Sequence, residues 1–262
     1  MTYTTFGEAF VPMQGEDPVQ ADMPASAASE PTCTAMRSAE RVLPLVFDLV
    51  HPASVLEIGC GDGAWLTMAR RLGAERILGI DEAPAERLRI PAEEFAMRDL
   101  AAIGELPGPF DLAMCLETAD RLDENDAMHM VEALCDVADV VLFSAAIPGQ
   151  SGFGHRNEQW PTYWEGLFGA FGFCMVDCLR IRLWDDPNVD PCYAQNSMLY
   201  VRRARLERDV RMREARLENG MMPLCAVHPG MFGDFAKPSA PERPDPRPSL
   251  PTPRMWESLR DG

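Results

Sequence analysis

Apolar runs alternate with amphipathic stretches through the middle of the chain, from about residue 53 to residue 203. Short apolar runs bounded by turn residues indicate buried strands, whereas apolar positions three and four apart indicate helices. Strands that alternate with helices pair in parallel through crossover connections. The pattern therefore predicts an α/β fold with a mostly parallel sheet. The predicted strands are 54–58, 76–80, 95–98, 110–116 and 139–145, and the predicted helices are 63–72 and 124–136.

The regular alternation of strand-like and helix-like stretches ends after residue 146. We expect an aromatic-rich helix near 160–171, followed by two β-like runs over 173–184 and 196–203. Two consecutive runs of this kind can pair antiparallel and close one side of an otherwise parallel sheet. The sheet is therefore expected to carry an antiparallel edge strand.

The two ends of the chain differ in composition from its middle. Residues 1–35 are rich in Pro, Ala, Ser and acidic residues, which is typical of a flexible N-terminal arm, and a helix is expected over 36–50. Residues 204–222 carry the Arg/Glu pattern of a solvated, charged helix, and a helix that contacts RNA is the alternative. Residues 223–262 form a Pro-rich C-terminal tail, either disordered or draped as an extended segment. The folded domain is accordingly expected over 36–203, and the arm is open to three readings: a lid, a dimer contact or a disordered segment.

Composition narrows the classes of function. The chain has 262 residues, 47% of them hydrophobic, which suits one well-buried domain with appendages. Its formal net charge is -17 at pH 7. Such an acidic chain repels the phosphates of nucleic acids and of anionic membrane surfaces, so neither is expected as a partner. No apolar run approaches the ~20 residues of a membrane-spanning helix, and no secretory signal is visible.

Eight cysteines and four histidines are scattered along the chain, and no two cysteines form a C-x-x-C pair. Zinc sites need closer spacing of their ligands, so no metal site is expected. Several cysteines stand within apolar strands, where a reduced cysteine behaves as a small hydrophobic residue. These features indicate a reducing compartment, and hence the cytoplasm.

One glycine-rich turn carries the strongest chemical signal. A buried strand leads directly into Gly59-Cys60-Gly61-Asp62-Gly63, and a helix follows. Glycines at such a junction let a ligand approach the backbone, and the helix N-terminus offers free N–H donors. Crevices of this kind lie at the carboxyl ends of strands in open α/β sheets. We therefore expect Gly59, Cys60, Gly61 and Gly63 to contact a cofactor.

The turn by itself fits two kinds of cofactor. Its spacing also matches the dinucleotide fingerprint, and Asp81 follows at a compatible distance. Glu57 stands just before the turn, however, and a carboxylate there would repel a pyrophosphate. A cofactor with an amino group and a sulfonium, but no phosphate, is compatible with that carboxylate. Together with the extra glycine at position 63, Glu57 favours S-adenosylmethionine over a nicotinamide or flavin cofactor.

Polar residues at the ends of the following strands are candidates for the same crevice. Asp81 is placed to accept both ribose hydroxyls, although an Asp there also caps helices well. Asp99 is placed to accept from the adenine amine, or else is a turn residue, and Leu100 is placed to pack on the ring. Glu117 ends the fourth strand, either at the floor of the crevice or as a partly exposed loop carboxylate.

With these motifs, the chain resembles bacterial class I S-adenosylmethionine-dependent methyltransferases over residues 41–201. The resemblance implies a Rossmann-like, doubly wound sheet, with S-adenosylmethionine as cofactor and S-adenosylhomocysteine as product. The Glu-His that is common in this family after the fourth strand is replaced here by Asp120 and Arg121, so no catalytic role is carried over to these positions. The stretches that carry the resemblance are Val55-Leu56-Glu57-Ile58-Gly59-Cys60-Gly61-Asp62-Gly63, Gly79-Ile80-Asp81, Arg98-Asp99-Leu100, Phe110-Asp111-Leu112 and Leu116-Glu117.

A second set of stretches resembles a bacterial subgroup of the same family. That subgroup is often linked with sugar or secondary-metabolite pathways, which implies a small-molecule acceptor. The stretches are Phe143-Ser144-Ala145-Ala146-Ile147-Pro148-Gly149-Gln150, Gly154-His155, Asn157-Glu158-Gln159-Trp160-Pro161, Trp184-Asp185-Asp186-Pro187 and Tyr193-Ala194-Gln195-Asn196.

Methyl transfer to a hydroxyl requires an aligned acceptor and a base that removes its proton. His155 is the candidate base, because histidine titrates near neutral pH and this one lies in a glycine-flanked loop after the fifth strand. A surface histidine or a purely structural hydrogen-bonding partner is the alternative.

Polar and aromatic residues around this loop are candidates for binding the acceptor. Polar side chains can grip hydroxyls, and aromatic rings can stack on a sugar or an aromatic face. Trp160 and Trp164 are four apart, however, a spacing that also places both on the core face of a helix. The candidate acceptor-binding residues are Gln150, Asn157, Glu158, Gln159, Trp160, Tyr163 and Tyr193.

The function expected from the sequence is O-methylation of a sugar-like or natural-product small molecule. An N-methyltransferase acting on a small-molecule amine is one rival, and it would need less help from a base. A non-catalytic cofactor-binding module that regulates a partner is the other. A homodimer is compatible with the sequence.

Overall fold

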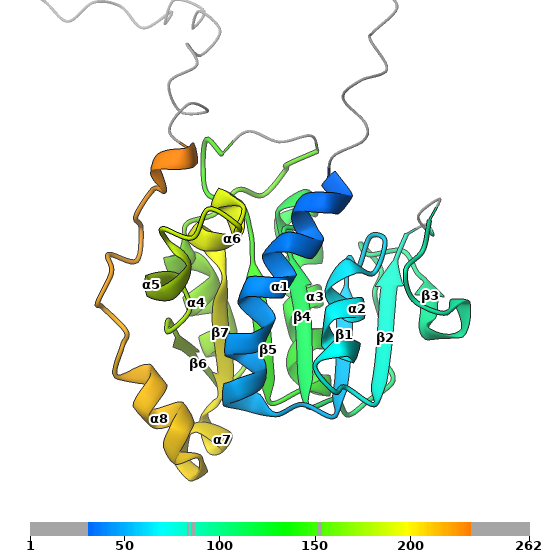
Figure 1. The fold of residues 1–262 in the computed structure, drawn as a ribbon, viewed down its shortest axis with the longest axis horizontal. Coiled ribbons are helices and arrows are strands. Elements are labelled where there is room, and N and C mark those ends of the chain that lie inside the picture. Colours follow the sequence, from blue (N-terminus) through cyan, green and yellow to red (C-terminus); the bar gives the residue numbers. More distant parts are fainter. Residues whose placement is uncertain (1–30, 83, 85–86, 151–153, 232–262) are drawn as a thin grey trace, which may run out of the picture.

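A seven-stranded sheet forms the centre of the molecule, with the strand order β3-β2-β1-β4-β5-β7-β6 (Figure 1). This computed structural model describes residues 31–82, 84, 87–150 and 154–231. The first five strands run parallel, and β7 pairs antiparallel with both β5 and β6. The strands are β1 Ser54–Ile58, β2 Arg76–Asp81, β3 Phe95–Met97, β4 Leu112–Leu116, β5 Val140–Ser144, β6 Phe173–Val176 and β7 Met198–Arg202.

Helices cover both faces of this sheet. In Figure 1, α1 crosses one face and α3 lies behind the other. The helices are α1 Pro31–Val50, α2 Ala64–Arg71, α3 Glu124–Val137, α4 Pro161–Ala170, α5 Arg180–Leu183, α6 Pro191–Asn196, α7 Arg203–Arg208 and α8 Val210–Arg216. Short 3₁₀ turns lie at Ala92–Glu94, Ala119–Arg121 and Pro229–Met231.

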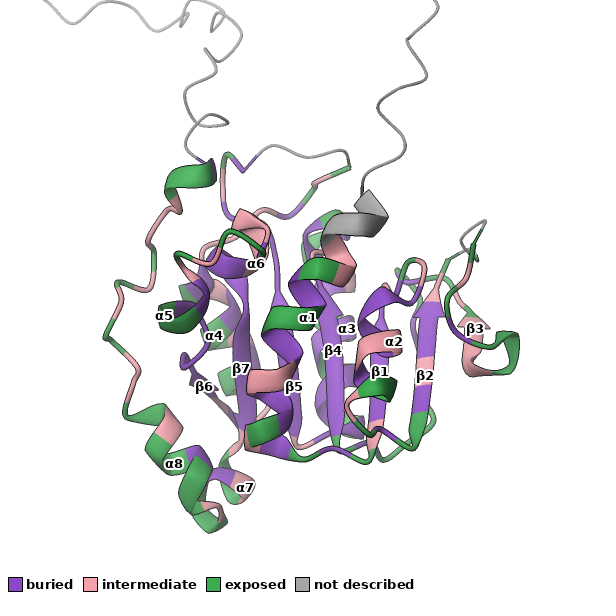
Figure 2. Cartoon of the chain, viewed as in Figure 1, coloured by how far each residue is buried: buried purple, intermediate pink, exposed green. Residues whose placement is uncertain are grey.

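The two faces of the sheet bury separate cores, and the central strands β4 and β5 are buried along their length, whereas β3 at the edge is not (Figure 2). In β4, Leu112, Met114 and Leu116 pack with α1 and α2, whereas Ala113 and Cys115 pack with α3 and α4. Strands buried on both faces read as continuous apolar runs rather than as alternating ones. This explains why the central strands could be recognised from hydrophobicity alone, and the predicted α/β sheet with its antiparallel edge is confirmed.

The structure corrects two of the predicted elements. The run 173–184 is a strand only to Val176, because the chain then turns so that Arg180 pairs with Asp177 inside the protein (Nη2 to Oδ2 2.5 Å). The charged stretch after residue 203 is two helices instead of one. Asp209 separates them, since its side chain accepts hydrogen bonds from the N–H groups that open α8.

Part of each predicted end lies inside the described structure. The first helix begins at Pro31, five positions before its expected start. Residues 223–231 run along the folded domain: the guanidinium of Arg180 donates to the carbonyl oxygens of Pro223 (3.3 Å) and Leu224 (3.2 Å). Residues 1–30 and 232–262, which make up most of the predicted arm and tail, fall outside the described residues. Within the described ranges, no helix is both long and apolar enough to span a membrane.

The strand order creates one special position. From β1 the chain moves outward to β2 and β3, and then returns to the other side of β1 with β4. The connections that leave β1 and β4 therefore diverge at the carboxyl ends of these strands. Ligands of open α/β sheets bind at such switch points, so the site is to be sought there.

Candidate functional site

A cleft of about 690 Å³ opens at this switch point. Pockets of a few hundred to a thousand Å³ suit cofactors and small substrates. Its walls come from the turn after β1, the ends of β2 and β4, and the loops after β3, β4 and β5. The predicted site residues that line it are Glu57, Gly59, Cys60, Gly61, Asp81, Leu100, Glu117 and Tyr193.

Glycine is required at two positions of the turn after β1 for different reasons. Gly59 has a φ of 75°, and a Cβ added there would lie 2.1 Å from Oγ1 of Thr118. Gly61 has a φ of 52°, but a Cβ there would meet no atom within 4 Å. The first glycine therefore allows the turn to pack against the end of β4, while the second leaves the backbone open toward the cleft.

Asp81 ties this turn to the neighbouring strand. Its Oδ2 accepts a hydrogen bond from the N–H of Gly61 at 2.7 Å, and its Oδ1 accepts from the N–H of Glu82 at 2.7 Å. The carboxylate also lines the cleft, so its remaining lone pairs face the space in which a ligand would lie. This is the placement expected for a residue that accepts ribose hydroxyls.

Glu57 is a buried carboxylate with an unused oxygen. Only 1% of the residue is exposed, and among the described residues Oε2 has no hydrogen-bond partner. Burial, followed by the nearby carboxylates of Asp81 and Asp62, raises the pKa of Glu57 well above its usual value. An unpaired buried carboxylate is costly, and a cationic ligand in the cleft would offset that cost.

Glu117 lies at the floor of the cleft in an unusual backbone conformation. Its φ is 48°, a left-handed value that is rare outside glycine. Its N–H donates to the carbonyl oxygen of Ser144 at 2.9 Å, which holds this turn against β5. Gln150 donates to its Oε2 at 2.9 Å, and Asn196 donates to its Oε1 at 3.1 Å. The strained backbone is therefore fixed by neighbouring elements, as is common at functional sites.

Burial, and then the neighbouring carboxylate of Asp120, raises the pKa of Glu117 to about 7. The hydrogen bonds that it accepts act in the opposite direction, because they favour the charged form. A carboxyl group with this pKa exists in both protonation states near neutral pH.

His155 lies behind the wall of the cleft and is not among the residues that line it. Its Nε2 is 3.1 Å from Oδ2 of the fully buried Asp120, and its Nδ1 is 2.9 Å from Oε1 of Glu158. The second oxygen of Glu158 accepts from the N–H of Gly149 at 2.8 Å. The ring thus hydrogen-bonds to Glu158 and lies within ion-pair distance of Asp120, whose oxygens have no hydrogen-bond partner among the described residues. These contacts hold the loop after β5 against the turn after β4.

Most of the other predicted acceptor-binding residues hold this loop together. Gln150 is buried within the network around Glu117. Gln159 donates to Oδ1 of Asn157 at 3.0 Å. Trp160 precedes α4, and Tyr163 packs edge-on against the core residue Trp164. Only Tyr193 reaches the cleft, where its ring meets that of Trp65 at 5.0 Å between centroids.

Two predicted cofactor residues also stay outside the cleft lining. Asp99 is exposed, and its Oδ1 accepts from the N–H of Ala101 at 3.0 Å, as in a turn residue. Gly63 has a φ of 79° at the N-terminus of α2, where a Cβ would lie 3.0 Å from Ile90. Leu100, next to Asp99, is buried and does line the cleft.

Sequence reasoning missed several residues of the cleft. Trp65, Thr118, Arg121 and Arg156 all line it. The departure at Arg121 from the family pattern was a signal for one of them. Arg156 gave no signal, because its position depends on a long-range contact: its N–H donates to the carbonyl oxygen of Asp120 at 2.8 Å.

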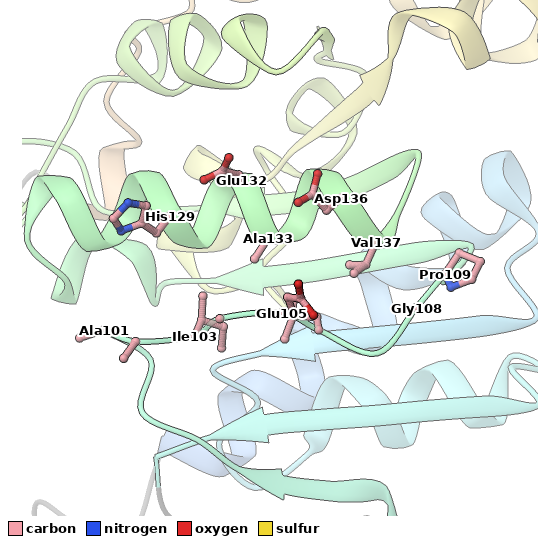
Figure 3. Close-up of a pocket in the computed structure, with 13 residues that line it drawn as sticks. Ala101, Ile103, Glu105, Gly108, Pro109, His129, Glu132, Ala133, Asp136 and Val137 are labelled. Carbon is pink, nitrogen blue, oxygen red and sulfur yellow. The ribbon is translucent and has the colours of Figure 1, made fainter.

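A second and larger cavity, of about 920 Å³, lies on the flank of the molecule (Figure 3). Figure 3 shows it between the loop that carries Ile103 and Glu105 and the helix α3, which contributes His129, Glu132 and Asp136. It contains none of the predicted site residues, and its wall at Pro109 reaches toward the amino-terminal end of β4. Of these two cavities, the smaller cleft is therefore the one that holds predicted functional residues.

The smaller cleft fits an adenosyl cofactor better than a dinucleotide. The buried, unpartnered oxygen of Glu57 suits a ligand that carries an ammonium or a sulfonium, and the same oxygen would repel a pyrophosphate. Asp81 can accept hydroxyl donors, and Leu100 offers an apolar surface to a ring. The donor set therefore agrees with S-adenosylmethionine.

Comparison with known proteins agrees with this chemistry. Residues 35–174 match the family model described as "Methyltransferase domain". A curated relative, the ribosomal protein L11 methyltransferase of Geotalea uraniireducens (strain Rf4), is 27% identical over 143 residues. The match covers 52% of this chain and 41% of that protein, so the chain spans well under two thirds of the relative's length.

Two solved structures are similar to this chain, and the first of them shows the shared fold. The sugar N-methyltransferase KedS8 from Streptoalloteichus sp ATCC 53650 is similar with a TM-score of 0.51 and 16% identity, covering 77% of this chain and 100% of KedS8. Magnesium protoporphyrin IX methyltransferase from Synechocystis PCC 6803, crystallised with bound SAH, has a TM-score of 0.46 and 20% identity, covering 65% and 84% of the two chains.

Proposed function

Since this chain belongs to the methyltransferase domain family and uses S-adenosylmethionine, we propose that it methylates a hydroxyl group of a sugar-like or natural-product small molecule. When bound, S-adenosylmethionine supplies a methyl group on a sulfonium, and its sulfur leaves with the bonding electron pair as S-adenosylhomocysteine. The residues that would hold it are the glycine turn, Asp81 through the ribose hydroxyls, Glu57 through the positive charge and Leu100 through the adenine ring.

The proposal depends mainly on the position of Glu117. Its carboxylate lies at the floor of the cleft, one residue from Thr118, which packs on the glycine turn. Gln150 and Asn196 fix its orientation, yet a carboxylate has further lone pairs that can accept a proton. An acceptor hydroxyl placed between this carboxylate and the methyl group would have its proton-accepting partner within the cleft.

In the proposed reaction, the acceptor oxygen forms a bond to the methyl carbon while the carbon–sulfur bond breaks. Glu117 takes the proton that the hydroxyl loses. The pKa of about 7 for Glu117 suits this role, because a base is most effective when its pKa is close to the working pH. We thus assign the role of general base to Glu117 instead of His155, for which it was predicted from the sequence. His155, together with Asp120 and Glu158, positions the loop after β5.

The first test is methyl transfer from labelled S-adenosylmethionine to a panel of sugars and aromatic natural products that carry either hydroxyls or amines, with products identified by mass spectrometry. We expect hydroxyl acceptors to be methylated. With the best acceptor, Glu117→Gln should lower kcat by about 100-fold, since general-base catalysis contributes 10²–10⁴-fold. The rise of kcat with pH near 7 should disappear in this variant.

Three results would contradict the proposal. Methylation of amines alone would favour the N-methyltransferase alternative, because an amine needs less help from a base. An unchanged kcat for Glu117→Gln would remove its assigned role. S-adenosylmethionine binding without any transfer across the panel would favour the non-catalytic module. Glu214→Gln, which changes an exposed carboxylate of α8 outside the cleft lining, serves as the matched control.

The remaining expectations extend this proposal. We propose a small-molecule acceptor with neither nucleic acid nor membrane as a partner, because the net charge of -17 opposes both. A reducing, cytoplasmic setting is proposed because seven of the eight cysteines are free thiols, at positions 60, 115, 135, 174, 178, 192 and 225. The homodimer remains a prediction that light scattering on a sizing column can test.

A further inference from the structure

Two arginines on one wall of the cleft have no role in holding the cofactor as described above. Arg121 ends the 3₁₀ turn Ala119–Arg121 after β4, and Arg156 lies in the loop after β5. Both line the cleft. Their backbones are neighbours, because the N–H of Arg156 donates to the carbonyl oxygen of Asp120 at 2.8 Å. The two arginines therefore join the cleft wall from neighbouring segments of backbone.

The fold uses most arginines elsewhere for structural pairing. Arg89 pairs with Asp62 beside the glycine turn, Arg202 pairs with Asp139, and Arg180 is buried against Asp177. Within the described residues, neither Arg121 nor Arg156 has an ion pair or a side-chain hydrogen bond. Both are exposed, so a partner that enters the cleft can reach them.

The acidic residues of the cleft come mainly from other elements than the two arginines. Glu57, Asp62, Asp81 and Glu82 come from the ends of β1 and β2, where the cofactor is expected. Glu117 is held by amide donors at the floor. Asp126, in the first turn of α3, lines the cleft closer in sequence to Arg121, and no ion pair within 4 Å joins them.

From this arrangement we infer that the methyl acceptor carries an anionic group, a carboxylate or a phosphate, which Arg121 and Arg156 bind at the wall of the cleft; the inference rests on the proposed function. A guanidinium presents a planar set of donors that matches the oxygens of either anion. A chain with 41 acidic and 24 basic residues repels anions at long range, so an anionic acceptor needs local cations of this kind. A neutral sugar would not need them.

The test measures anion binding directly, on protein saturated with S-adenosylhomocysteine. Inorganic phosphate and acetate are titrated separately and followed by NMR shifts of labelled arginine side chains. We expect saturable binding of at least one anion by the wild-type protein, and the stronger of the two identifies the group on the acceptor. In the double variant R121Q/R156Q, binding should weaken at least tenfold. Arg216→Gln is the matched control, since this exposed arginine belongs to α8 at the β6 edge of the sheet, outside the cleft lining (Figure 1).

Two outcomes would overturn the inference. The first is equal anion binding by the wild type and the double variant, including no binding by either. The second is a tenfold or greater loss of S-adenosylhomocysteine affinity in the double variant, because the arginines would then bind the cofactor's own carboxylate. If only the proposed function is wrong, the result differs: the protein still binds anions through the two arginines, but it methylates no hydroxyl acceptor.

With an active acceptor in hand, a second readout separates binding from chemistry. R121Q/R156Q should raise KM for an anionic acceptor at least tenfold and leave kcat within threefold, whereas a neutral analogue should show no such change. Added salt should raise KM for the wild type more than for the double variant, because exposed charge pairs are screened. Equal effects on neutral and anionic acceptors would refute the inference.

Discussion

Glu57 shows how a single side chain can favour function over stability. The residue is buried and its raised pKa means that the folded protein disfavours the ionised form. The usual pKa of 4.5 applies to the unfolded chain, so the unfolded state ionises first as the pH rises. Stability contributed by the neutral carboxyl is therefore present at low pH and lost progressively above about pH 4.5.

We predict that Glu57→Gln stabilises the cofactor-free protein at pH 8, because the amide carries no charge to desolvate. The melting temperature should rise by at least ~2 °C, which corresponds to roughly 1 kcal/mol in a domain of this size. Between pH 5 and 8, the melting temperature of this variant should also decrease less with rising pH than that of the wild type. The same variant should bind S-adenosylmethionine at least ~tenfold more weakly, and a normal affinity would contradict the role given to Glu57.

His155 tests whether a histidine in an acceptor loop is a base or a clamp. If its contacts with Asp120 and Glu158 serve to hold the loop, His155→Ala should lower kcat less than tenfold and reduce the melting temperature by a few degrees. A loss of 100-fold or more in kcat, with S-adenosylhomocysteine affinity intact, would return the proton-accepting role to His155. Steady-state kinetics and calorimetry on the same preparation decide between the two.

At the scale of elements, the glycine turn is the part of the site that the sequence predicts best. A strand, three glycines and a helix are local signals, and they place Gly59, Gly61 and Glu57 at the cleft. The loop after β5 could not be assigned in the same way. The spacing of Asn157 and Gln159 is compatible with binding a sugar, but long-range contacts with Asp120 and Ala146 turn these residues toward the protein.

The contacts of Asp99 could not be assigned from the sequence either. Its position after the third strand matches a residue that binds adenine, yet an equally local interaction, its hydrogen bond to the N–H of Ala101, engages the side chain. Propensity and spacing cannot rank these two possibilities. We predict that Asp99→Asn changes S-adenosylmethionine affinity less than threefold, measured by calorimetry, whereas a tenfold loss would restore the adenine contact predicted from the sequence.

The two turn glycines should respond differently to alanine. Gly59→Ala combines a positive φ with a contact of 2.1 Å to Thr118, so we predict a loss of at least ~3 kcal/mol in unfolding free energy. Gly61→Ala has the positive φ but open space around it, and should cost about 1–2 kcal/mol. Urea unfolding of both variants tests this order, and equal losses would show that packing against Thr118 is not what requires glycine at position 59.

At the scale of the whole molecule, the segment 223–231 is anchored to the domain at two places. The N–H of His228 donates to Oε1 of Gln195 at 2.7 Å, and the start of the segment is held by Arg180. Arg180 is completely buried, pairs with Asp177 and donates to the carbonyl oxygens of Pro223 and Leu224. The sequence offered no sign of this, because the apolar run 173–184 continues on both sides of Arg180 and was expected to form one strand. Its burial became evident only from the contacts between distant segments.

We predict that Arg180→Ala lowers the unfolding free energy by about 3–5 kcal/mol, since it leaves the Asp177 carboxylate buried without its partner. Proteolysis near Leu224 should become faster. Arg182→Ala is the matched control, because its pair with Glu218 is partly exposed, at 45% and 25% of the two side chains, and should be worth less than about 1 kcal/mol. Similar losses in the two variants would mean that Arg180 does not anchor the segment.

The measurement that tests the central claim most directly is calorimetric titration of the protein with S-adenosylmethionine, S-adenosylhomocysteine and NAD. We predict micromolar binding of both adenosyl ligands and no binding of NAD. In Asp81→Ala, the affinity for the adenosyl ligands should fall at least ~tenfold, which corresponds to ~1.4 kcal/mol. Preference for NAD, or no binding of either adenosyl ligand, would contradict the assignment of the cleft at the ends of β1 and β4 to S-adenosylmethionine.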